Sequence, residues 1–190
     1  MRLVSFKKSN EIKIGLVQKD GATVVDLSIA APDLPADMNG FIDLGQSAMD
    51  QAAAASAEEG EGAKLKLSEV ELVAPIPNPR RNVFCVGRNY YEHAQEFHDS
   101  GFDATSGATA VPDDPIIFTK ATTSVSGPSD PIPSYLDSSN STDYEGELAV
   151  IIGKEGRGIK KADAFDYVYG YTVSNDVTAR TLQHKHKQWH

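Results

Sequence analysis

Asp143-Tyr144-Glu145-Gly146-Glu147-Leu148-Ala149-Val150-Ile151-Ile152-Gly153 is the stretch on which the interpretation of this chain depends. Its second half is a run of apolar, partly β-branched residues that stops at a glycine, which predicts a buried strand. Because successive side chains of a strand point to opposite faces, Glu145 and Glu147 share one face. Two neighbouring carboxylates repel each other and are costly to bury. The stretch therefore predicts a strand that carries two ligands of a divalent cation.

The size and composition of the chain are those of an ordinary globular protein. It has 190 residues, of which 40% are hydrophobic and 24% are charged. This length is enough for one large domain or for a small domain beside a larger one. The net charge of -9, with no offsetting basic patch, argues against a nucleic-acid partner. No apolar run approaches the length of a membrane span, which argues against a membrane partner.

The N-terminus and the cysteine content bear on the compartment. Residues 1–8 have no long apolar region after their charges, so no secretory signal is predicted. The single cysteine, Cys85, cannot form an internal disulfide, which fits a reducing compartment. We therefore predict a cytoplasmic protein, with the mitochondrial matrix as the alternative. Cys85 itself lies in a strand-like run, and we expect it to fill space in the core.

Residues 1–74 are expected to form a small N-terminal domain. The predicted elements are strands over 2–6, 13–18 and 22–27, a hairpin turn at Asp20-Gly21, a loop over 28–38, one helix over 41–57 and a short strand or extended piece over 65–73. Pro75, Pro77 and Pro79 then form a stiff extended linker, so the domain boundary is placed at residue 75. This part carries no convergent polar cluster, and we interpret it as an accessory domain.

Residues 75–190 are expected to form the larger domain. The predicted elements are strands over 82–86, 115–119 and 168–173, short helices over 88–97 and 162–166, a long loop over 99–114 and a last helix over 177–190. Asp176 follows the third of these strands, as a further acid beside the two of the opening stretch. Arg180 and Gln183 are three residues apart and would share one face of the last helix.

His93 and Glu96 are also three residues apart, so on a helix their side chains are near neighbours. A carboxylate beside an imidazole orients the ring and favours its protonated form, which suits a general base. The alternative is a solvated helix face with an incidental ion pair. The spacing alone favours this alternative.

Four motifs follow one another in the second half of the chain. They are Val86-Gly87-Arg88-Asn89-Tyr90 leading to His93 and Glu96, Pro115-Ile116-Ile117-Phe118-Thr119-Lys120, Asp143-Tyr144-Glu145-Gly146-Glu147-Leu148, and Gly170-Tyr171-Thr172-Val173-Ser174-Asn175-Asp176-Val177-Thr178-Ala179-Arg180. Together they resemble the fumarylacetoacetate hydrolase family, from about Asn82 to the last residue. The resemblance implies an α+β, mostly β fold: a β-roll catalytic domain with a small N-terminal α+β domain. It also implies a homodimer.

The resemblance implies a metal site. Glu145, Glu147 and Asp176 match the family's ligands for Mg²⁺ or Mn²⁺, with Ca²⁺ as an alternative. The residue types support the same interpretation, because an all-oxygen carboxylate site suits a hard divalent cation. Such a site also leaves room for water and for substrate oxygens.

The resemblance implies an activity as well: a metal-dependent hydrolase or lyase that cleaves a C–C bond in a small 2-oxo acid or 1,3-diketone. The substrate would be of the acylpyruvate, fumarylpyruvate or oxaloacetate type, and related isomerisations occur in the family. The metal would chelate the oxo-acid oxygens and stabilise the enolate formed when the adjacent bond breaks. His93 and Glu96 match a pair that activates water, and Lys120 is a further catalytic candidate. The implied substrate-binding residues are Arg88, Tyr90, Arg180 and Gln183.

The chain departs from the family pattern at its end. Members normally continue into a segment with a lysine near the active site and the remaining strands of the roll, whereas this chain stops at Trp189-His190. The shortfall is comparable to a small domain's worth of core. Two hypotheses follow: a metal-dependent enzyme, and a truncated, non-catalytic relative that keeps the metal site and acts only through association.

Overall fold

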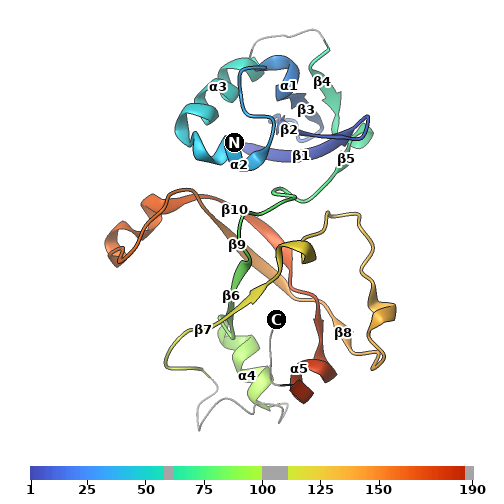
Figure 1. Ribbon diagram of the computed structural model, residues 1–190, viewed down its shortest axis with the longest axis vertical. Coiled ribbons are helices and arrows are strands. Elements are labelled where there is room, and N and C mark those ends of the chain that lie inside the picture. The colour runs from blue at the N-terminus through green and yellow to red at the C-terminus, as the bar shows by residue number, and fades with distance from the viewer. Residues whose placement is uncertain (58–61, 100–110, 187–190) are drawn as a thin grey trace. The chain divides into compact units, whose positions relative to one another are not determined.

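The computed structural model describes residues 1–57, 62–99 and 111–186. The α+β class is confirmed, with helix about as abundant as strand among the described elements (Figure 1). The chain divides into two compact units, each built from several segments. The first comprises Met1–Asn78, Val125–Pro131 and Glu147–Ser174, and the second comprises Pro79–Ser124, Ile132–Gly146 and Asn175–His190. The domain boundary at residue 75 stays a prediction.

A five-stranded antiparallel sheet is the frame of the first unit. Its strands are β1 (Arg2–Lys8), β2 (Glu11–Val17), β3 (Thr23–Asp26), β4 (Lys64–Lys66) and β5 (Glu71–Leu72), in the order β4-β3-β2-β1-β5. Ser9 and Asn10 join β1 to β2 with positive φ angles of 52° and 66°, as a two-residue hairpin requires. The Asp20 carboxylate closes the next turn by accepting hydrogen bonds from the amide and hydroxyl of Thr23. The first three predicted strands and the Asp20 turn are confirmed.

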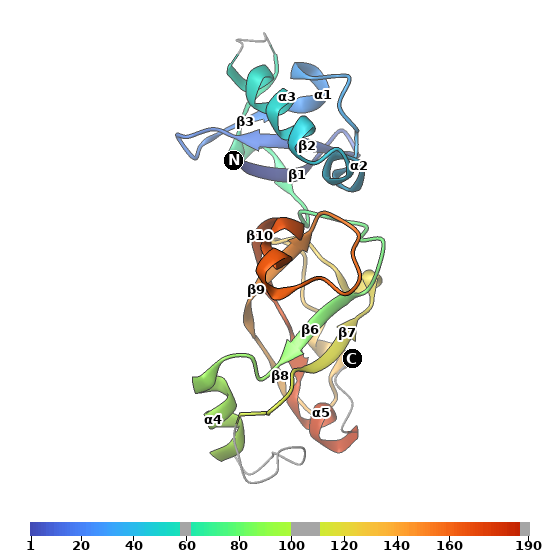
Figure 2. The ribbon, with the colours of Figure 1, turned by 90° about the vertical axis from the view of Figure 1, so that its left-hand side faces the viewer.

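Three helices cover one face of this sheet, with α3 lying across the strands (Figure 2). They are α1 (Leu27–Ala30), α2 (Met38–Asp43) and α3 (Gln46–Ala57). Two predictions for this region are wrong. Helix α1 lies where a loop was predicted, because the Asp26 side chain accepts a hydrogen bond from the Ser28 amide and caps the helix. The single helix predicted over 41–57 is two helices, because Gly45 adopts a positive φ of 55° after α2.

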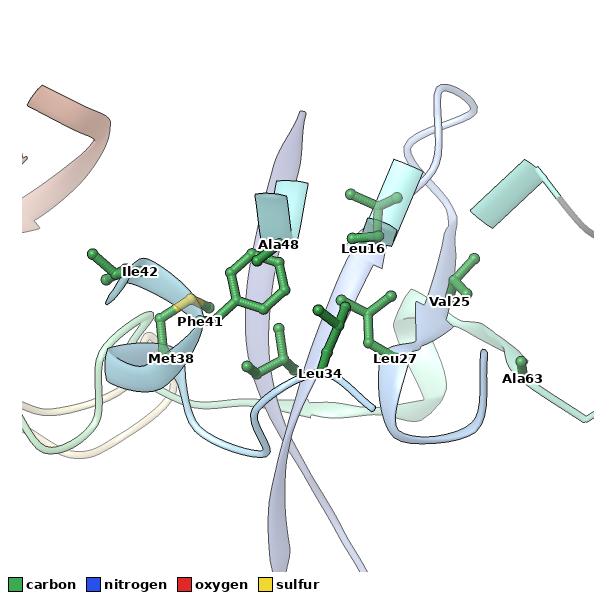
Figure 3. Packing of buried hydrophobic residues seen from close by; sticks show 11 residues of the cluster. Leu16, Val25, Leu27, Leu34, Met38, Phe41, Ile42, Ala48 and Ala63 are labelled. Carbon is green, nitrogen blue, oxygen red and sulfur yellow. The ribbon is translucent and has the colours of Figure 1, made fainter. Parts of the chain in front are cut away.

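The core of the first unit lies between these helices and the sheet (Figure 3). Leu16 from β2, Phe41 from α2 and Ala48 from α3 are all buried in it. A second buried pair, Phe6 and Val24, lies against Gly15. A Cβ atom at Gly15 would lie 2.4 Å from Val24 Cγ1 and 3.0 Å from Phe6 Cε1, so this position has no room for a side chain.

Strands β9 (Gly146–Ile152) and β10 (Val168–Asn175) pair with each other, and the short 3₁₀ helix η4 (Lys161–Tyr167) precedes β10. The prediction of a buried strand over 143–153 is wrong in two respects. The strand begins only at Gly146, so Tyr144 and Glu145 precede it and lie outside regular structure. Burial also alternates along β9, and Leu148 is 60% exposed, as expected for a strand covered on one face. Ile151 packs against the core of the first unit.

In its described part, the second unit contains two short antiparallel strand pairs and two helices. Strand β6 (Val83–Gly87) pairs with β7 (Ile116–Lys120), and β8 (Thr142–Asp143) pairs with β11 (Thr178–Ala179). The helices are α4 (Tyr91–Asp99) and α5 (Arg180–His186). Short 3₁₀ turns lie at η1 (Leu67–Glu69) of the first unit and at η2 (Thr122–Ser124) and η3 (Ser134–Leu136) of the second. Strands β6 and β7 and helix α4 confirm the predictions for this region.

Three further predictions concern the last helix, the long loop and Cys85. The last helix begins at Arg180 instead of Val177, because Thr178 and Ala179 pair with β8; residues 187–190 lie outside the described residues. The predicted long loop over 99–114 falls mostly on residues 100–110, which also lie outside them. Cys85 is half-buried instead of filling a core, because β6 exposes side chains on both faces, with Phe84 69% exposed. Across the described ranges, none of the helices is long and apolar enough to cross a membrane.

Candidate metal centre

The pairing of β8 with β11 brings two of the predicted metal ligands together. In this antiparallel pair Asp143 lies opposite Thr178, so the residues just outside the pair also meet. The Asp176 amide donates a hydrogen bond of 2.8 Å to the Glu145 carbonyl oxygen. The Glu145 amide in turn donates a hydrogen bond of 2.9 Å to Asn175 Oδ1. Glu145 and Asp176 are therefore held side by side by main-chain contacts.

Lys120, at the end of β7, neutralises the Asp176 carboxylate. Its Nζ atom lies 2.6 Å from Asp176 Oδ1, and the Asp176 side chain is only 11% exposed. The Asp176 Oδ1 atom is buried and accepts no hydrogen bond from the described residues in addition to this ion pair. A buried carboxylate oxygen with unused acceptor capacity can ligate a cation.

Arg180, the first residue of α5, neutralises the Glu145 carboxylate and that of a third acid, Asp143. Its Nη1 atom lies 2.5 Å from Glu145 Oε1, and its Nη2 and Nε atoms lie 2.9 and 3.0 Å from Asp143 Oδ2. Burial acts to lower the pKa of the Arg180 guanidinium, but the hydrogen bond to Asp143 and the charge of Glu145 together raise it. The guanidinium therefore remains charged and fixed between the two acids.

The gathered residues fit a divalent cation in their chemistry. Glu145 and Asp176 supply hard carboxylate oxygens, the ligand type that Mg²⁺ and Mn²⁺ prefer. Glu147 lies on β9 and belongs to the first unit, so its place in the ligand set stays a prediction. Within the described residues, no group of three or more histidine, cysteine or acidic side chains is close enough together to hold a metal ion.

The other predicted site residues are located separately. Arg88 is buried, with 7% exposure and a positive φ of 53°, and Tyr90 beside it is exposed. Arg88 lines a pocket of about 260 Å³ whose other lining residues come from 86–89, 91 and 111–115. They include none of Tyr90, Glu145 and Asp176.

Gln183 and the predicted catalytic pair lie on helices α5 and α4, respectively. Gln183 is on α5, one turn after Arg180, and its Oε1 atom is buried without a hydrogen bond from the described residues. His93 and Glu96 are on α4, but their side chains lie outside the described residues, so their pairing stays a prediction.

Two acids that the sequence analysis did not single out contribute to the centre. Asp143 holds Arg180, as described above. Asp137 is buried and accepts hydrogen bonds from the turn that leads into β8. The hydroxyl and amide of Ser139 and the amide of Ser141 hold the pKa of the Asp137 carboxyl well below its usual range, although burial opposes them. The available signal was the run Asp137-Ser138-Ser139, since an aspartate followed two residues later by serine is typical of a side-chain-closed turn.

The fold and these contacts define a protein of mixed α+β structure with a carboxylate centre at the junction of β8 and β11. Comparison with known proteins defines its family. The family model described as Fumarylacetoacetate (FAA) hydrolase C-terminal matches residues 82–190, which is more than half of the chain. The chain belongs to the fumarylacetoacetate hydrolase family, as the four motifs predicted.

Two curated relatives carry the same activity in their names. The mitochondrial oxaloacetate tautomerase fahd2 of Xenopus laevis is 42% identical over 193 residues, an alignment that covers 100% of this chain and 56% of the relative. Oxaloacetate tautomerase YisK of Bacillus subtilis is 49% identical over 123 residues, which cover 65% of this chain and 38% of the relative. The chain thus spans about half the length, or less, of these two relatives.

Solved structures of the same family share the fold. A fumarylacetoacetate hydrolase from Exiguobacterium antarcticum matches with a TM-score of 0.70 and 34% identity, covering 100% of this chain and 60% of that one. A maleylpyruvate hydrolase from Sphingobium, solved with manganese and pyruvate, matches with a TM-score of 0.64 and 26% identity over 95% of this chain and 60% of that one. The predicted family fold is confirmed.

Proposed function

We propose that this protein is an enzyme that acts on a small 2-oxo acid and uses a divalent cation. One observation carries the proposal: β8 and β11 hold Glu145 and Asp176 together by the 2.8 Å hydrogen bond between their main chains. Two acids held this way, with Asp176 largely buried, are the hard oxygen donors that such a cation needs. Glu147 is the proposed third ligand, by resemblance.

The reaction that we put first is the keto–enol tautomerisation of oxaloacetate. Both curated relatives described above are named for it. The reaction removes a proton from carbon 3 and adds one to the oxygen on carbon 2, with no bond between carbons broken. A bound Mg²⁺ or Mn²⁺ would stabilise the negative charge that develops on the oxo-acid oxygens.

The residues of this chain have separate proposed roles. Glu145 and Asp176 would hold the cation, and Arg180 would bind a substrate carboxylate through its guanidinium while Asp143 keeps that group oriented. Gln183, whose buried Oε1 has unused acceptor capacity, would accept a hydrogen bond from the substrate. Lys120 would supply positive charge beside Asp176.

The remaining proposed roles rest on the resemblance. His93 and Glu96 are the proposed acid–base pair, and Arg88 and Tyr90 the proposed further substrate contacts. Arg88 adds a buried positive charge at the wall of a pocket, which suits an anionic substrate group.

Hydrolytic or decarboxylating cleavage of a C–C bond is the second candidate reaction. The similarity to a maleylpyruvate hydrolase solved with manganese and pyruvate favours it. Cleavage and tautomerisation share the need to stabilise an enolate, so the same cation site would serve either one. A homodimer, Mn²⁺ or Mg²⁺ as the cation, and a cytoplasmic or mitochondrial location complete the proposal.

The test is turnover by the purified chain with Mg²⁺, with Mn²⁺ and with EDTA. Oxaloacetate is supplied as its enol, and the loss of enol ultraviolet absorbance is followed. Pyruvate formation from oxaloacetate and from acetylpyruvate reports C–C cleavage in parallel. We expect metal-dependent acceleration that is lost in Glu145→Gln and retained in Glu155→Gln, which changes an exposed acid of the turn after β9. Acceleration that survives both EDTA and Glu145→Gln would contradict the proposed site.

A further inference from the structure

The Asp137 carboxylate accepts hydrogen bonds from three residues of the turn that follows it, Ser139, Ser141 and Thr142. It is 9% exposed. Its Oδ1 accepts hydrogen bonds from the amide of Ser139, at 2.9 Å, and from the Ser139 hydroxyl. Its Oδ2 accepts from the amide of Ser141 at 2.7 Å, and from the hydroxyls of Ser141 and Thr142 at 3.1 Å each. One carboxylate therefore fixes the turn from residue 137 to residue 142.

This turn holds the first residues of α5. The Ser141 carbonyl oxygen accepts a hydrogen bond of 3.1 Å from the Arg180 amide. The Ser141 hydroxyl accepts one of 3.0 Å from the Thr181 amide while it also contacts Asp137. The position of Ser141, and with it the start of α5, therefore depends on Asp137.

The same turn leads directly into the carboxylate centre. Thr142, whose hydroxyl is bound by Asp137, is the first residue of β8 and lies opposite Ala179 of β11. Arg180 extends from the end of β11 to Glu145, which its Nη1 atom contacts at 2.5 Å. Two routes thus connect Asp137 to the proposed ligand Glu145, one through β8 and one through Arg180.

The charge of Asp137 matters as well as its shape. An ionised carboxylate only accepts hydrogen bonds, so both oxygens can serve the donors of this turn. An asparagine has one acceptor oxygen and would direct an NH₂ group at the amide of Ser139 or at that of Ser141. Because a buried donor left without an acceptor is costly, the turn would have to rearrange.

We propose that Asp137 is a positioning residue for the carboxylate centre, which it acts on through Ser141 and Arg180 without touching a ligand or substrate. This inference rests on the proposed function, because it assigns Asp137 to the outer shell of the proposed cation site. Partners of metal ligands in this position orient the ligands and set the affinity for the metal.

The first test compares Asp137→Asn with Asp130→Asn in the full chain. Asp130 is a matched control, since its exposed carboxylate also accepts a turn hydrogen bond, from the Gly127 amide at 2.6 Å. Mn²⁺ affinity is measured by calorimetry, and circular dichroism establishes the folded fraction. We expect Asp137→Asn to bind Mn²⁺ about 10-fold more weakly or worse, as is typical when an outer-shell partner is lost. Asp130→Asn should bind as the wild type does.

A second measurement does not depend on metal. Hydrogen exchange of the Arg180 and Thr181 amides is followed in the wild type, Asp137→Asn and Ser141→Ala. We expect both variants to speed exchange of the Thr181 amide, and Asp137→Asn to speed that of Arg180 as well. Ser141→Ala serves if Asp137→Asn does not fold, because it removes the bridging hydroxyl alone.

The outcomes separate the two proposals. A wild type that binds no Mn²⁺ overturns the proposed function. Faster exchange of the Arg180 and Thr181 amides in Asp137→Asn would then still show that Asp137 positions the start of α5. Folded Asp137→Asn with wild-type Mn²⁺ affinity overturns the inference, as does unchanged exchange of the Thr181 amide in Ser141→Ala.

Discussion

Lys120 occupies the Asp176 carboxylate, for which the proposed divalent cation would have to compete. Removing the Lys120 charge is therefore predicted to raise the affinity for the metal. The Lys120 Nζ atom lies 2.6 Å from Asp176 Oδ1, in the place where a cation bound to that oxygen would add positive charge. We predict that Lys120→Met binds Mn²⁺ more tightly than the wild type while it loses activity. Methionine is similar in length and flexible, so it can occupy the same space without the charge.

The magnitude follows from the charges involved. Two unit charges about 4 Å apart interact by about 1 kcal/mol in bulk water and by more inside a protein, and a doubly charged ion doubles the figure. Because the Lys120 side chain is 25% exposed, we take the water-like value as a lower bound. Removing the ammonium should therefore favour Mn²⁺ by at least about 2 kcal/mol, which is more than tenfold in affinity.

The assay is calorimetric titration of EDTA-treated protein with Mn²⁺ at neutral pH, beside the enol-oxaloacetate assay. Lys154→Met is the matched control, since Lys154 is an exposed lysine of the turn after β9. It should leave both affinity and activity unchanged. Weaker or unchanged Mn²⁺ binding in Lys120→Met would refute the reasoning, because it would mean that Lys120 supports the ligand geometry and does not compete with the ion.

Three further predictions concern stability and the acids around the centre. Gly15→Ala should destabilise the chain by about 1–3 kcal/mol in urea unfolding, because the new Cβ would overlap Val24; an unchanged midpoint would mean that the sheet has room there. The lowered pKa of Asp137 stabilises the fold above the ordinary carboxyl value of about 4, and this contribution is lost as pH falls from there toward the depressed value. Acid unfolding followed by circular dichroism should therefore be less steep in Asp137→Asn, and equal slopes would argue against the prediction. Arg180→Lys should weaken substrate binding, seen as a raised KM, because an ammonium cannot contact Asp143 and Glu145 together as the guanidinium does; an unchanged KM would count against its substrate role.

The strands of the fold could largely be predicted from the sequence, whereas the ends of the helices could not. Alternation over residues 13–18 and the apolar runs at 82–86 and 115–119 correctly predict β2, β6 and β7, because side-chain periodicity is a local property. The break at Gly45 and the late start of α5 were missed. Gly45 lies in an alanine-rich helical pattern that gives no local sign of a break. The start of α5 depends on Thr178 pairing with Asp143 and on Ala179 pairing with Thr142.

The sequence by itself determined the family and supplied the acids that we propose as cation ligands. The acids Glu145, Glu147 and Asp176 and the order of the four motifs are written in the chain, and the ligand type of a cation site follows from residue identity alone. Only the tertiary structure decided which charges meet. The pairing of Lys120 with Asp176 and the bridge of Arg180 between Asp143 and Glu145 join segments that lie far apart in the chain. The Arg180 contacts depend on the register of β8 against β11, and the Lys120 contact depends on the end of β7 lying beside Asp176. Neighbouring residues in the sequence cannot reveal such long-range pairings.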